Sequence, residues 1–499
     1  MSRVNALFNP RQRSRLAPIT TRDPARYPAW ERPLEEQYLQ TLLTNTLGNT
    51  FYVSSKDLLK ESHTIHDRMM AEDPEFATKA LGYGRNKGFM RTQPVFGLAK
   101  LFMTDKDRFK RAFGQVVRTP NDLRDFITIL CSLGWNKSGK CVKRTAGRWL
   151  AQKLGEYWAI KYGASKVGEW SIRDLMIILH PKRMRSDLAD YMMGRETNLE
   201  ELPQIAAFEA LKKATDAKEK VRLITEGRLP HEVASTFAGK DTEVWDAIAP
   251  QMPIFALLRN LATLERHGVL DNHREMVQRK FNDPEVIGKS KILPFRFLDA
   301  IDHVSSPWAQ DSLRDALELS FGNLPEIPGR TVVCLDISGS MQGRFLLIGG
   351  IFAISLMKKT NYNGRFFLFN HCLHEAKVSM RDSVLSQART IRSSGSTRTD
   401  LIAQWMLQEK FEADNLILIT DEQQNQGSPF IDVLNRYRRM VNKKINVFIV
   451  DVSPYRTGLL EPNDPAYFIY GWSLQVLNFV SMASRGWGTM AEAIKTDKV

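Results

Sequence analysis

Cysteine is scarce in this chain, with four residues among 499. This small number argues against a disulfide scaffold and agrees with a reducing compartment. Long hydrophobic runs are also missing: no stretch of about 18 apolar residues occurs, and residues 1–30 lack the apolar core of a secretory signal. We therefore expect a soluble protein of the cytoplasm that makes no contact with membranes.

Acidic residues are few near the N-terminus, where residues 1–30 hold six arginines and one acid, Asp23. This composition is shared by organelle presequences and by mobile basic arms, and we interpret residues 1–30 as a mobile arm. The whole chain has 70 Lys and Arg against 56 Asp and Glu, a net charge of +14. Such a positive field favours polyanionic partners, of which nucleic acid is the commonest.

Helical periodicity dominates from residue 32 to about residue 321, because apolar residues recur there at spacings of three and four. Ile254, Leu257, Leu258 and Leu261 are an example. So long a helical region packs poorly as one bundle, which favours helix-pair repeats that bury their faces against one another. The expected helices span residues 94–103, 123–133, 146–160, 172–179, 205–213, 298–301 and 313–319.

The pattern changes at residues 332–335, an unbroken apolar run typical of a parallel strand that is covered on both faces. Similar runs begin at Arg365, Asn415 and Ile445, with helical segments between them. Alternating strands and helices predict a doubly wound α/β domain. Prolines and a glycine interrupt both patterns near residues 325–329, so we place a helical domain at 31–325 and an α/β domain at 330–499.

The motif Asp-x-Ser-x-Ser at residues 336–340 directly follows the first predicted strand, at the edge where α/β folds bind ligands. Three oxygen ligands are too few for Mg²⁺, which needs about six in near-octahedral array. Suitable oxygens follow in Asp421, at the end of a strand, and in Thr397 or its rival Thr399, just before a helix.

The alternative for each of these residues is a helix cap or turn without a metal. Because all five oxygen residues fall at strand or helix ends, we predict a divalent cation, Mg²⁺, as cofactor. The predicted metal ligands are Asp336, Ser338, Ser340, Thr397 and Asp421.

Basic residues gather at 135–166, a segment that contains eight Lys and Arg residues and one acid, Glu156. If this segment is helical, Lys140, Arg144 and Arg148 stack on one face and repel one another unless an anion such as phosphate is present. The interleaved aromatic residues suit either a core or stacking on unpaired bases, and the basic face suits either solvent or RNA. The candidate RNA-binding residues are Lys137, Lys140, Lys143, Arg144, Arg148, Lys161 and Lys166, with a weaker group, Arg85, Lys87 and Arg91, for which an ordinary exposed turn is the favoured explanation when the group is taken alone. His180 ends an apolar helix, and a lone histidine of this kind usually has a structural role.

Signs of catalysis are missing, because the nine histidines form no Ser-His-Asp or Cys-His set and the phosphate-binding GxxxxGK[ST] loop does not occur. We therefore expect no enzymatic activity.

Five features of the chain form a larger pattern in the order in which they occur. They are NTLGNTFYVS near Asn45, RTQPVFGLAKLF from Arg91, VWDAIAPQMPIFALLRNLATL from Val244, KILPFRFLDAI from Lys291 and the Asp-x-Ser-x-Ser motif. The pattern resembles the Ro ribonucleoprotein family, in which a TROVE domain precedes a von Willebrand factor A domain.

This resemblance implies a ring of HEAT-like repeats completed by the A domain, with a metal-ion-dependent adhesion site (MIDAS) at the five oxygen residues. It implies binding of small noncoding Y-like RNA and of the single-stranded ends of misfolded RNA, and RNA-processing proteins as partners at the metal-site face. The basic RNA surface that it implies includes residues 140–166 and adds His180 to the candidate RNA-binding residues. The competing hypothesis is a metal-dependent protein-interaction module on a helical scaffold, in which an open coordination position accepts an acidic group of a partner.

Overall fold

The structure is a computed structural model that describes residues 21–22, 28–31, 33–45, 55–163, 170–290, 292, 294–322, 326–360, 363–452, 457–460, 464, 466–470 and 490–496. The chain divides into two compact units: unit 1 comprises Met1–Pro94 and Phe321–Val499, and unit 2 comprises Val95–Ser320. The first helices of the chain thus group with the C-terminal α/β part, whereas the sequence pattern had placed them with the other helices.

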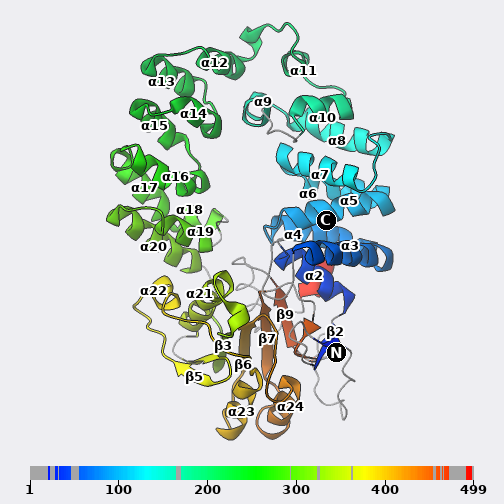
Figure 1. Ribbon diagram of the computed structural model, residues 1–499, viewed down its shortest axis with the longest axis vertical. Coiled ribbons are helices and arrows are strands. Elements are labelled where there is room, and N and C mark those ends of the chain that lie inside the picture. Colours follow the sequence, from blue (N-terminus) through cyan, green and yellow to red (C-terminus); the bar gives the residue numbers. More distant parts are fainter. Residues whose placement is uncertain are drawn as a thin grey trace. The chain divides into compact units, whose positions relative to one another are not determined.

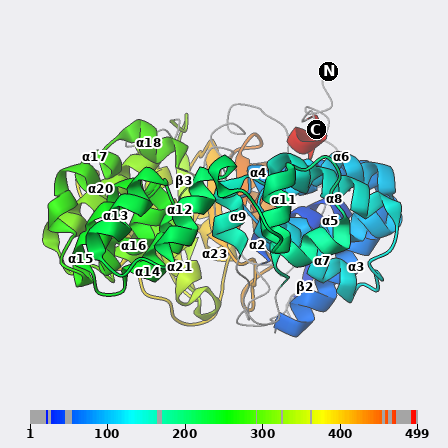
Figure 2. The same ribbon diagram turned by 90° about the horizontal axis from the view of Figure 1, so that it is seen from above.

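Unit 2 consists of helices that pack on helices close to them in the chain (Figures 1 and 2). Helix α13 packs on α12 and α15, α14 packs on α15, and α8 packs on α6 and α10. This successive packing confirms the predicted helical-repeat fold. The elements are α5 (Thr92–Thr104), α6 (Lys106–Val116), α7 (Pro120–Ser132), α8 (Lys140–Lys153), α9 (Glu156–Gly163), α10 (Ile172–Leu179), α11 (Ser186–Met193), η2 (Leu199–Glu201), α12 (Pro203–Leu211), α13 (Ala217–Glu226), α14 (His231–Ala238), α15 (Thr242–Ile248), η3 (Ala249–Gln251), α16 (Ile254–Arg266), η4 (Asp271–His273), α17 (Arg274–Phe281), α18 (Pro284–Lys289), α19 (Pro294–Ile301) and α20 (Pro307–Gly322).

Local side-chain chemistry explains several helix starts in this unit. The side chains of Thr119 and Ser171 each accept a hydrogen bond from the backbone N–H three residues on. The aspartate at that position accepts one from the backbone N–H of the capping residue, which forms a capping box at α7 and at α10. Helix α10 occupies the span expected from the sequence. The single helix expected over 146–160 was wrong, because Leu154 is extended and separates α8 from α9.

Unit 1 contains a six-stranded sheet in the order β5-β4-β3-β6-β7-β9, in which only the edge strand β5 runs antiparallel to its neighbour (Figure 1). Every residue of β3 and β6 is buried, as the unbroken apolar runs predict. With the helices, the sheet confirms the predicted doubly wound α/β domain. The strands are β3 (Thr331–Asp336), β4 (Gly364–Phe369), β5 (Leu373–Ala376), β6 (Asn415–Thr420), β7 (Asn446–Asp451) and β9 (Ala466–Tyr470), and the helices between them are η5 (Gly339–Met341), α21 (Arg344–Lys358), α22 (Val384–Ala388), α23 (Asp400–Gln408) and α24 (Phe430–Met440).

The first helices of the chain join this α/β part through long-range contacts. Helix α2 packs on β9 and on the C-terminal helix α26, which also packs on α4. The buried amide of Gln40 donates to the Asp451 carboxylate at 2.6 Å. The bounds are α2 (Leu34–Thr44), α3 (Ser55–Glu72), α4 (Pro74–Asn86) and α26 (Met490–Thr496).

Most of the basic arm predicted for residues 1–30 lies outside the described residues. The exceptions are β1 (Thr21–Arg22) and β2 (Pro28–Glu31), which pair with each other, and β2 pairs in turn with β8 (Thr457–Gly458). Among the helices that the structure describes, none is both long and apolar enough to cross a membrane.

Candidate nucleic-acid interface and metal site

Helix α8 places three exposed cations on one face. Lys140, Arg144 and Arg148 stand four residues apart, and we call them the α8 stripe. The opposite face is buried and contains Val142 and Leu150. Within the described part of the chain, no acid forms an ion pair with any residue of the stripe. The helical spacing of these three residues that was expected from the sequence is therefore present, and their charges face solvent.

A glycine on α8 lets the end of α10 approach closely. A Cβ atom at Gly147 would stand 3.2 Å from the Leu179 carbonyl oxygen and 3.5 Å from the Cα of Pro181. Between these two residues, His180 ends α10 in the left-handed conformation (φ 49°, ψ 60°) and is exposed. The structure thus places His180 next to α8, which the sequence alone could not show.

Two further cations follow His180 and were not among the predicted site residues. Lys182 and Arg183 are both exposed, and Arg183 also has a positive φ of 61°. The signal was present in the sequence as the run His-Pro-Lys-Arg, but only the packing at Gly147 shows that this run neighbours the α8 stripe.

The remaining candidates in unit 2 have different surroundings. The ammonium group of Lys137 lies 4.6 Å from the centre of the Trp170 ring, and that of Lys161 lies 2.7 Å from the Glu232 carboxylate. The charge of Lys161 is therefore already offset. Lys143 is half-buried, and Lys166 lies outside the described residues.

The weaker candidate group belongs to unit 1, whereas the α8 stripe belongs to unit 2. Arg85 is half-buried near the end of α4, whereas Lys87 and Arg91 are exposed. The Lys87 ammonium lies 5.7 Å from the centre of the Tyr83 ring.

Of the aromatic residues interleaved with the cations, Trp135 and Trp149 belong to the core. Trp149 is buried, and its ring centre lies 5.9 Å from that of Trp158. Tyr157 is more exposed, at 37%. Stacking on unpaired bases is therefore unavailable to Trp149 as it is placed.

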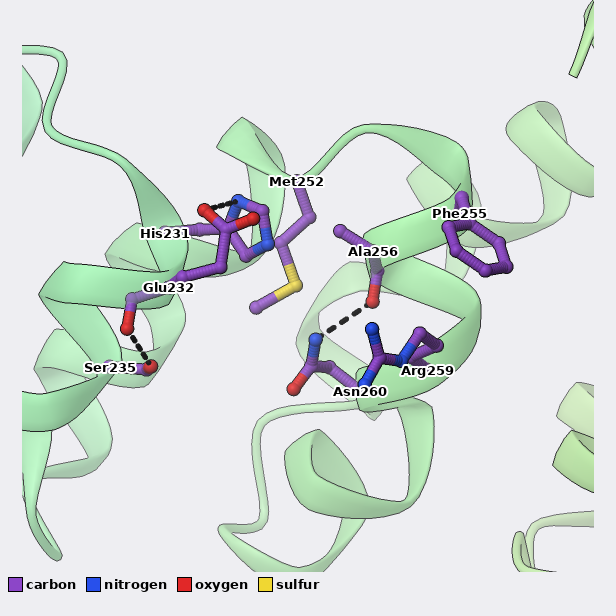
Figure 3. A pocket seen from close by; sticks show the side chains of 8 residues that line it. All are labelled: His231, Glu232, Ser235, Met252, Phe255, Ala256, Arg259 and Asn260. Atoms are coloured by element: carbon purple, nitrogen blue, oxygen red, sulfur yellow. Dashed lines mark hydrogen bonds and ion pairs between the residues drawn. The ribbon is translucent and has the colours of Figure 1, made fainter. Parts of the chain in front are cut away.

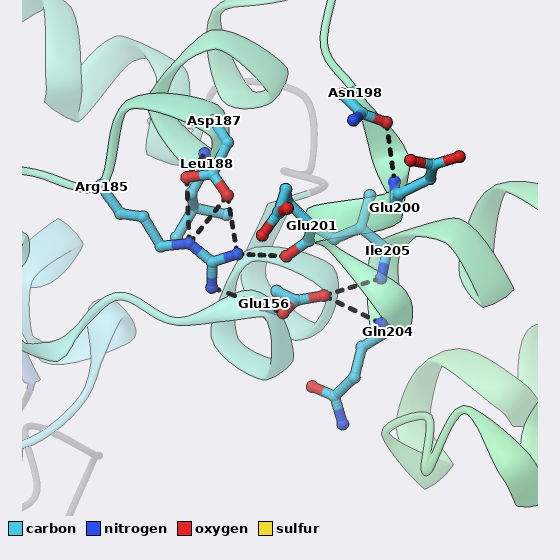
Figure 4. Close-up of polar contacts among 9 residues, drawn as sticks. All are labelled: Glu156, Arg185, Asp187, Leu188, Asn198, Glu200, Glu201, Gln204 and Ile205. Atoms are coloured by element: carbon cyan, nitrogen blue, oxygen red, sulfur yellow. Dashed lines mark hydrogen bonds and ion pairs between the residues drawn. The ribbon is translucent and has the colours of Figure 1, made fainter.

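The one acid of this basic segment has a structural task. The Glu156 carboxylate accepts hydrogen bonds from the backbone N–H groups of Gln204 and Ile205 at 2.9 and 3.2 Å, at the start of α12 (Figure 4). It also lies 3.7 Å from the Arg185 guanidinium. The bonds hold the start of α9 against the start of α12, which agrees with the interruption of the helix between α8 and α9.

The predicted metal ligands lie on three loops that backbone contacts hold together. The N–H of Gly339 donates to the Gly395 carbonyl at 3.0 Å, and the N–H of Thr397 donates to the Asn425 side chain at 2.8 Å. Parallel pairing of β3 with β6 brings Asp336 and Asp421 to the same edge of the sheet. The sequence-predicted residues are thus brought together, and all of them are buried.

Hydrogen bonds orient the oxygen atoms of this cluster. Asp336 accepts from the Ser338 N–H at 2.8 Å and from the Thr420 hydroxyl at 2.7 Å. The hydroxyl oxygens of Ser338 and Ser340 lie 3.1 Å apart, and Ser340 also bonds to the Asp421 carboxylate.

The two carboxylates are costly to keep charged where they stand. Burial raises the pKa of Asp336 to about 6, even though its hydrogen bonds lower it. Burial also raises the pKa of Asp421 well above its ordinary value, and the charges of Asp336 and Asp451 raise it further. A cation among these oxygens would favour the ionised forms of both groups.

Both candidate threonines offer a suitable oxygen. Thr397 and Thr399 are buried, and neither hydroxyl oxygen has a hydrogen-bond partner among the described residues. An unsatisfied buried hydroxyl is unusual and fits a role as a cation ligand. The donor set of carboxylates and hydroxyls is one that Mg²⁺ prefers.

Within the described ranges, no group of three or more His, Cys, Asp or Glu residues could hold a metal ion, so the candidate site depends on its hydroxyls. Asp451, which ends β7 at the same edge, was not predicted as part of this cluster, although its position at the end of an apolar run parallels that of Asp421.

Comparison with known proteins gives consistent similarities. Residues 230–321 match the TROVE domain. The RNA-binding protein RO60 of Deinococcus radiodurans is 24% identical over 499 residues, covering 91% of this chain and 93% of the relative. The RNA-binding protein RO60 of Caenorhabditis elegans is 24% identical and covers 57% of this chain and 48% of the relative. The crystal structure of the Deinococcus radiodurans RO (RSR) protein superposes with a TM-score of 0.67 at 20% identity, over 91% of this chain and 100% of the other.

The chain resembles the Ro family over most of its length. The predicted resemblance is thereby confirmed, and the Ro fold accounts for both the helical part and the α/β part. The TROVE match includes the segments from Val244 and Lys291 that carried the prediction. It contains neither the α8 stripe nor the metal-ligand candidates, so their roles rest on their geometry.

Proposed function

We propose that this chain is a non-catalytic RNA-binding protein of the Ro type. It binds small noncoding Y-like RNA and the single-stranded ends of misfolded RNA, and it serves RNA quality control in a ribonucleoprotein. The observation that carries this proposal is the exposed α8 stripe with His180 beside it. Stacked like charges are unfavourable alone, and regularly spaced phosphates neutralise them with release of counterions. The two relatives named RNA-binding protein RO60 support the same assignment.

RNA copurification tests the proposal. The protein is isolated at low salt from the cells that make it, as wild type and with Lys140, Arg144 and Arg148 all changed to Ala, and the bound RNA is sequenced. A matched control changes Lys213, Lys218 and Lys240 to Ala. These three residues are exposed and belong to unit 2, so their replacement removes the same number of positive charges from other positions of that unit. We expect a discrete small RNA with the wild type and the control, and its loss with the α8 variant.

Salt dependence provides a second measure with purified components. Each phosphate contact contributes about −0.9 to the slope of log K against log salt concentration, so loss of the α8 stripe should reduce the slope by roughly three. Equal losses in the α8 variant and the control would show a general charge effect and contradict an interface on α8. Absence of bound RNA at any salt concentration would contradict RNA binding as a whole.

For the oxygen cluster of unit 1, we infer that it binds Mg²⁺ through Asp336, Ser338, Ser340, Asp421 and one of the two threonines. The cation would supply positive charge that stabilises the two buried carboxylates. Mn²⁺ binding followed by electron paramagnetic resonance tests this with the full chain. Ser338→Ala and either Thr397→Ala or Thr399→Ala should weaken binding, whereas Ser386→Ala, an exposed serine on α22, should not. Equal Mn²⁺ affinity in all variants would contradict the site.

A protein-interaction role for the same site is less favoured by the geometry. An acidic group of a partner would have to reach a cation whose five protein ligands are all buried. We therefore propose a stabilising role for the metal, and we keep RNA-processing proteins as candidate partners. Cytoplasmic location remains a prediction that agrees with the four free thiols.

A further inference from the structure

A pocket of about 280 Å³ opens in unit 2 between α14 and α16 (Figure 3). Its size lies just below the range of ligand pockets, which measure roughly 300–1,000 Å³. Its lining residues all fall within the span that matches the TROVE domain, yet none belongs to the candidate RNA-binding residues predicted from the sequence.

One wall of the pocket contains a buried histidine, His231, whose surroundings favour one protonation state. His231 Nδ1 lies 3.2 Å from the Glu232 carboxylate, whose other oxygen lies 2.7 Å from the Lys161 ammonium. Burial lowers the pKa of His231, so its neutral form is favoured. Because Nδ1 faces a carboxylate, it must carry the proton, and Nε2, on the Met252 side of the ring, is left as an acceptor (Figure 3).

The other wall is the exposed side of α16. The Asn260 amide nitrogen donates to the Ala256 carbonyl at 2.8 Å, which leaves the side-chain oxygen as a second acceptor. Arg259 is exposed and forms no ion pair within the part of the chain that the structure describes. The pocket therefore combines one available cation with two acceptors.

An aromatic ring stands at the edge of the same pocket. Phe255 precedes Arg259 by one helical turn and is 42% exposed, which is unusual for so large an apolar side chain. Exposed aromatic rings next to a cation are typical of surfaces that bind unpaired nucleotides, because the ring stacks on a base and the cation binds a phosphate.

We propose that this pocket binds one unpaired nucleotide of an RNA strand. The base stacks on Phe255 and donates an N–H group to His231 Nε2 or to the Asn260 oxygen, while Arg259 binds the adjoining phosphate. The inference rests on the proposed RNA binding and adds a second contact site to the α8 stripe. It requires no chemical step.

Binding of fluorescent ten-residue oligouridine and oligoadenosine to the full chain tests the pocket. Arg259→Ala and Phe255→Leu should each weaken binding by about five-fold or more, since one stacked base contributes on that scale. Arg266→Ala removes the same charge from the last turn of the same helix, outside the pocket, and should leave the affinity near the wild-type value. Circular dichroism confirms that each variant is folded.

A direct readout comes from the same oligouridine carrying 4-thiouridine. Irradiation should link it to a peptide within residues 252–260, and addition of free uridine monophosphate should compete only weakly. If the wild type binds the oligonucleotides but Arg259→Ala and Phe255→Leu bind equally well, or if links form only elsewhere, the pocket proposal is overturned and the proposed function stands. If the wild type binds no RNA, both are overturned.

Discussion

Single side chains decide how neighbouring helices of unit 2 meet. The carboxylate of Glu156 satisfies two backbone N–H groups at the start of α12, groups that a helix cannot satisfy internally (Figure 4). From the sequence, an acid in a segment of eight cations would be expected to form ion pairs with them. The structure shows instead that its main partners are backbone groups 48 and 49 residues away.

Replacement of this acid should weaken the unit. We expect Glu156→Ala to lower the free energy of unfolding by about 1–2 kcal/mol, the usual cost of losing a helix cap. Glu200→Ala, at an exposed position in η2, should change it by less than about 0.5 kcal/mol. Chemical denaturation of both variants measures the difference, and equal stabilities would show that the bonds to α12 contribute little.

His231 leads to a prediction about pH. Burial lowers its pKa, and the cations Lys161 and Arg259 lower it further, against the opposing effect of Glu232. The unfolded chain takes up this proton near pH 6.5, so the contribution of a neutral, buried His231 is lost as the pH falls below about 6.5. His231→Gln cannot be protonated, so its unfolding free energy should decrease less between about pH 7 and pH 5 than that of the wild type.

Urea unfolding across that range provides the measurement. His180→Gln, which changes an exposed histidine of the same unit, should follow the wild-type pH dependence. If His231→Gln also follows it, burial does not control the protonation of His231.

At the scale of elements, the contact of α8 with α10 determines where the basic residues lie. Gly147 has no side chain, so the α8 backbone can approach Leu179 and Pro181. This approach places His180, Lys182 and Arg183 next to the α8 stripe, although they are more than thirty residues away in the chain. The candidate RNA surface is therefore a property of two packed helices.

Filling the space at Gly147 should separate these helices. We expect Gly147→Leu to destabilise unit 2 by about 1–3 kcal/mol, because a larger side chain must displace backbone atoms of α10. Gly114→Ala is the matched control: nothing lies within 4 Å of a Cβ atom at this position of α6, so alanine should stabilise the helix by about 0.5–1 kcal/mol. Thermal unfolding distinguishes the two variants, and a gain in stability with Gly147→Leu would contradict close packing there.

At the scale of the molecule, unit 1 is assembled from the two ends of the chain. Helix α2 packs against β9 and α26, and the buried bond from Gln40 to Asp451 spans 411 residues. Contacts of so large a sequence separation are costly to form, because closing the long loop between them loses conformational entropy. The α/β domain of this protein therefore includes elements that precede the helical unit.

The bond between Gln40 and Asp451 offers a test of this assembly. Gln40→Ala would leave a buried carboxylate without its amide donor, so we expect a loss of about 1–3 kcal/mol in the stability of unit 1. Gln408→Ala, at an exposed site on α23 of the same unit, should have almost no effect. Thermal unfolding of the full chain measures both, and equal transitions would show that α2 is not needed for the stability of the α/β part.

Periodicity along the chain was enough to predict the helical region, the buried strands and the order of the two fold types. These features depend on residues near one another, since apolar residues at helical spacing or in short unbroken runs specify which face is buried. The oxygen cluster was predictable in part for a related reason: parallel strands bring their carboxyl ends to one edge, so Asp336 and Asp421 were expected at the same edge of the sheet. That β3 and β6 are neighbouring strands came from the structure.

Contacts between distant residues decided the rest. Four features depend on residues that are far apart in the chain. They are the position of α2 in unit 1, the packing of His180 near Gly147, the hydrogen bonds from the start of α12 to Glu156, and the pocket between α14 and α16. Local patterns state which face of an element is buried, but they do not state which other element covers it. That choice depends on shape, on single glycines and on buried polar bonds, which exist only after the chain has folded.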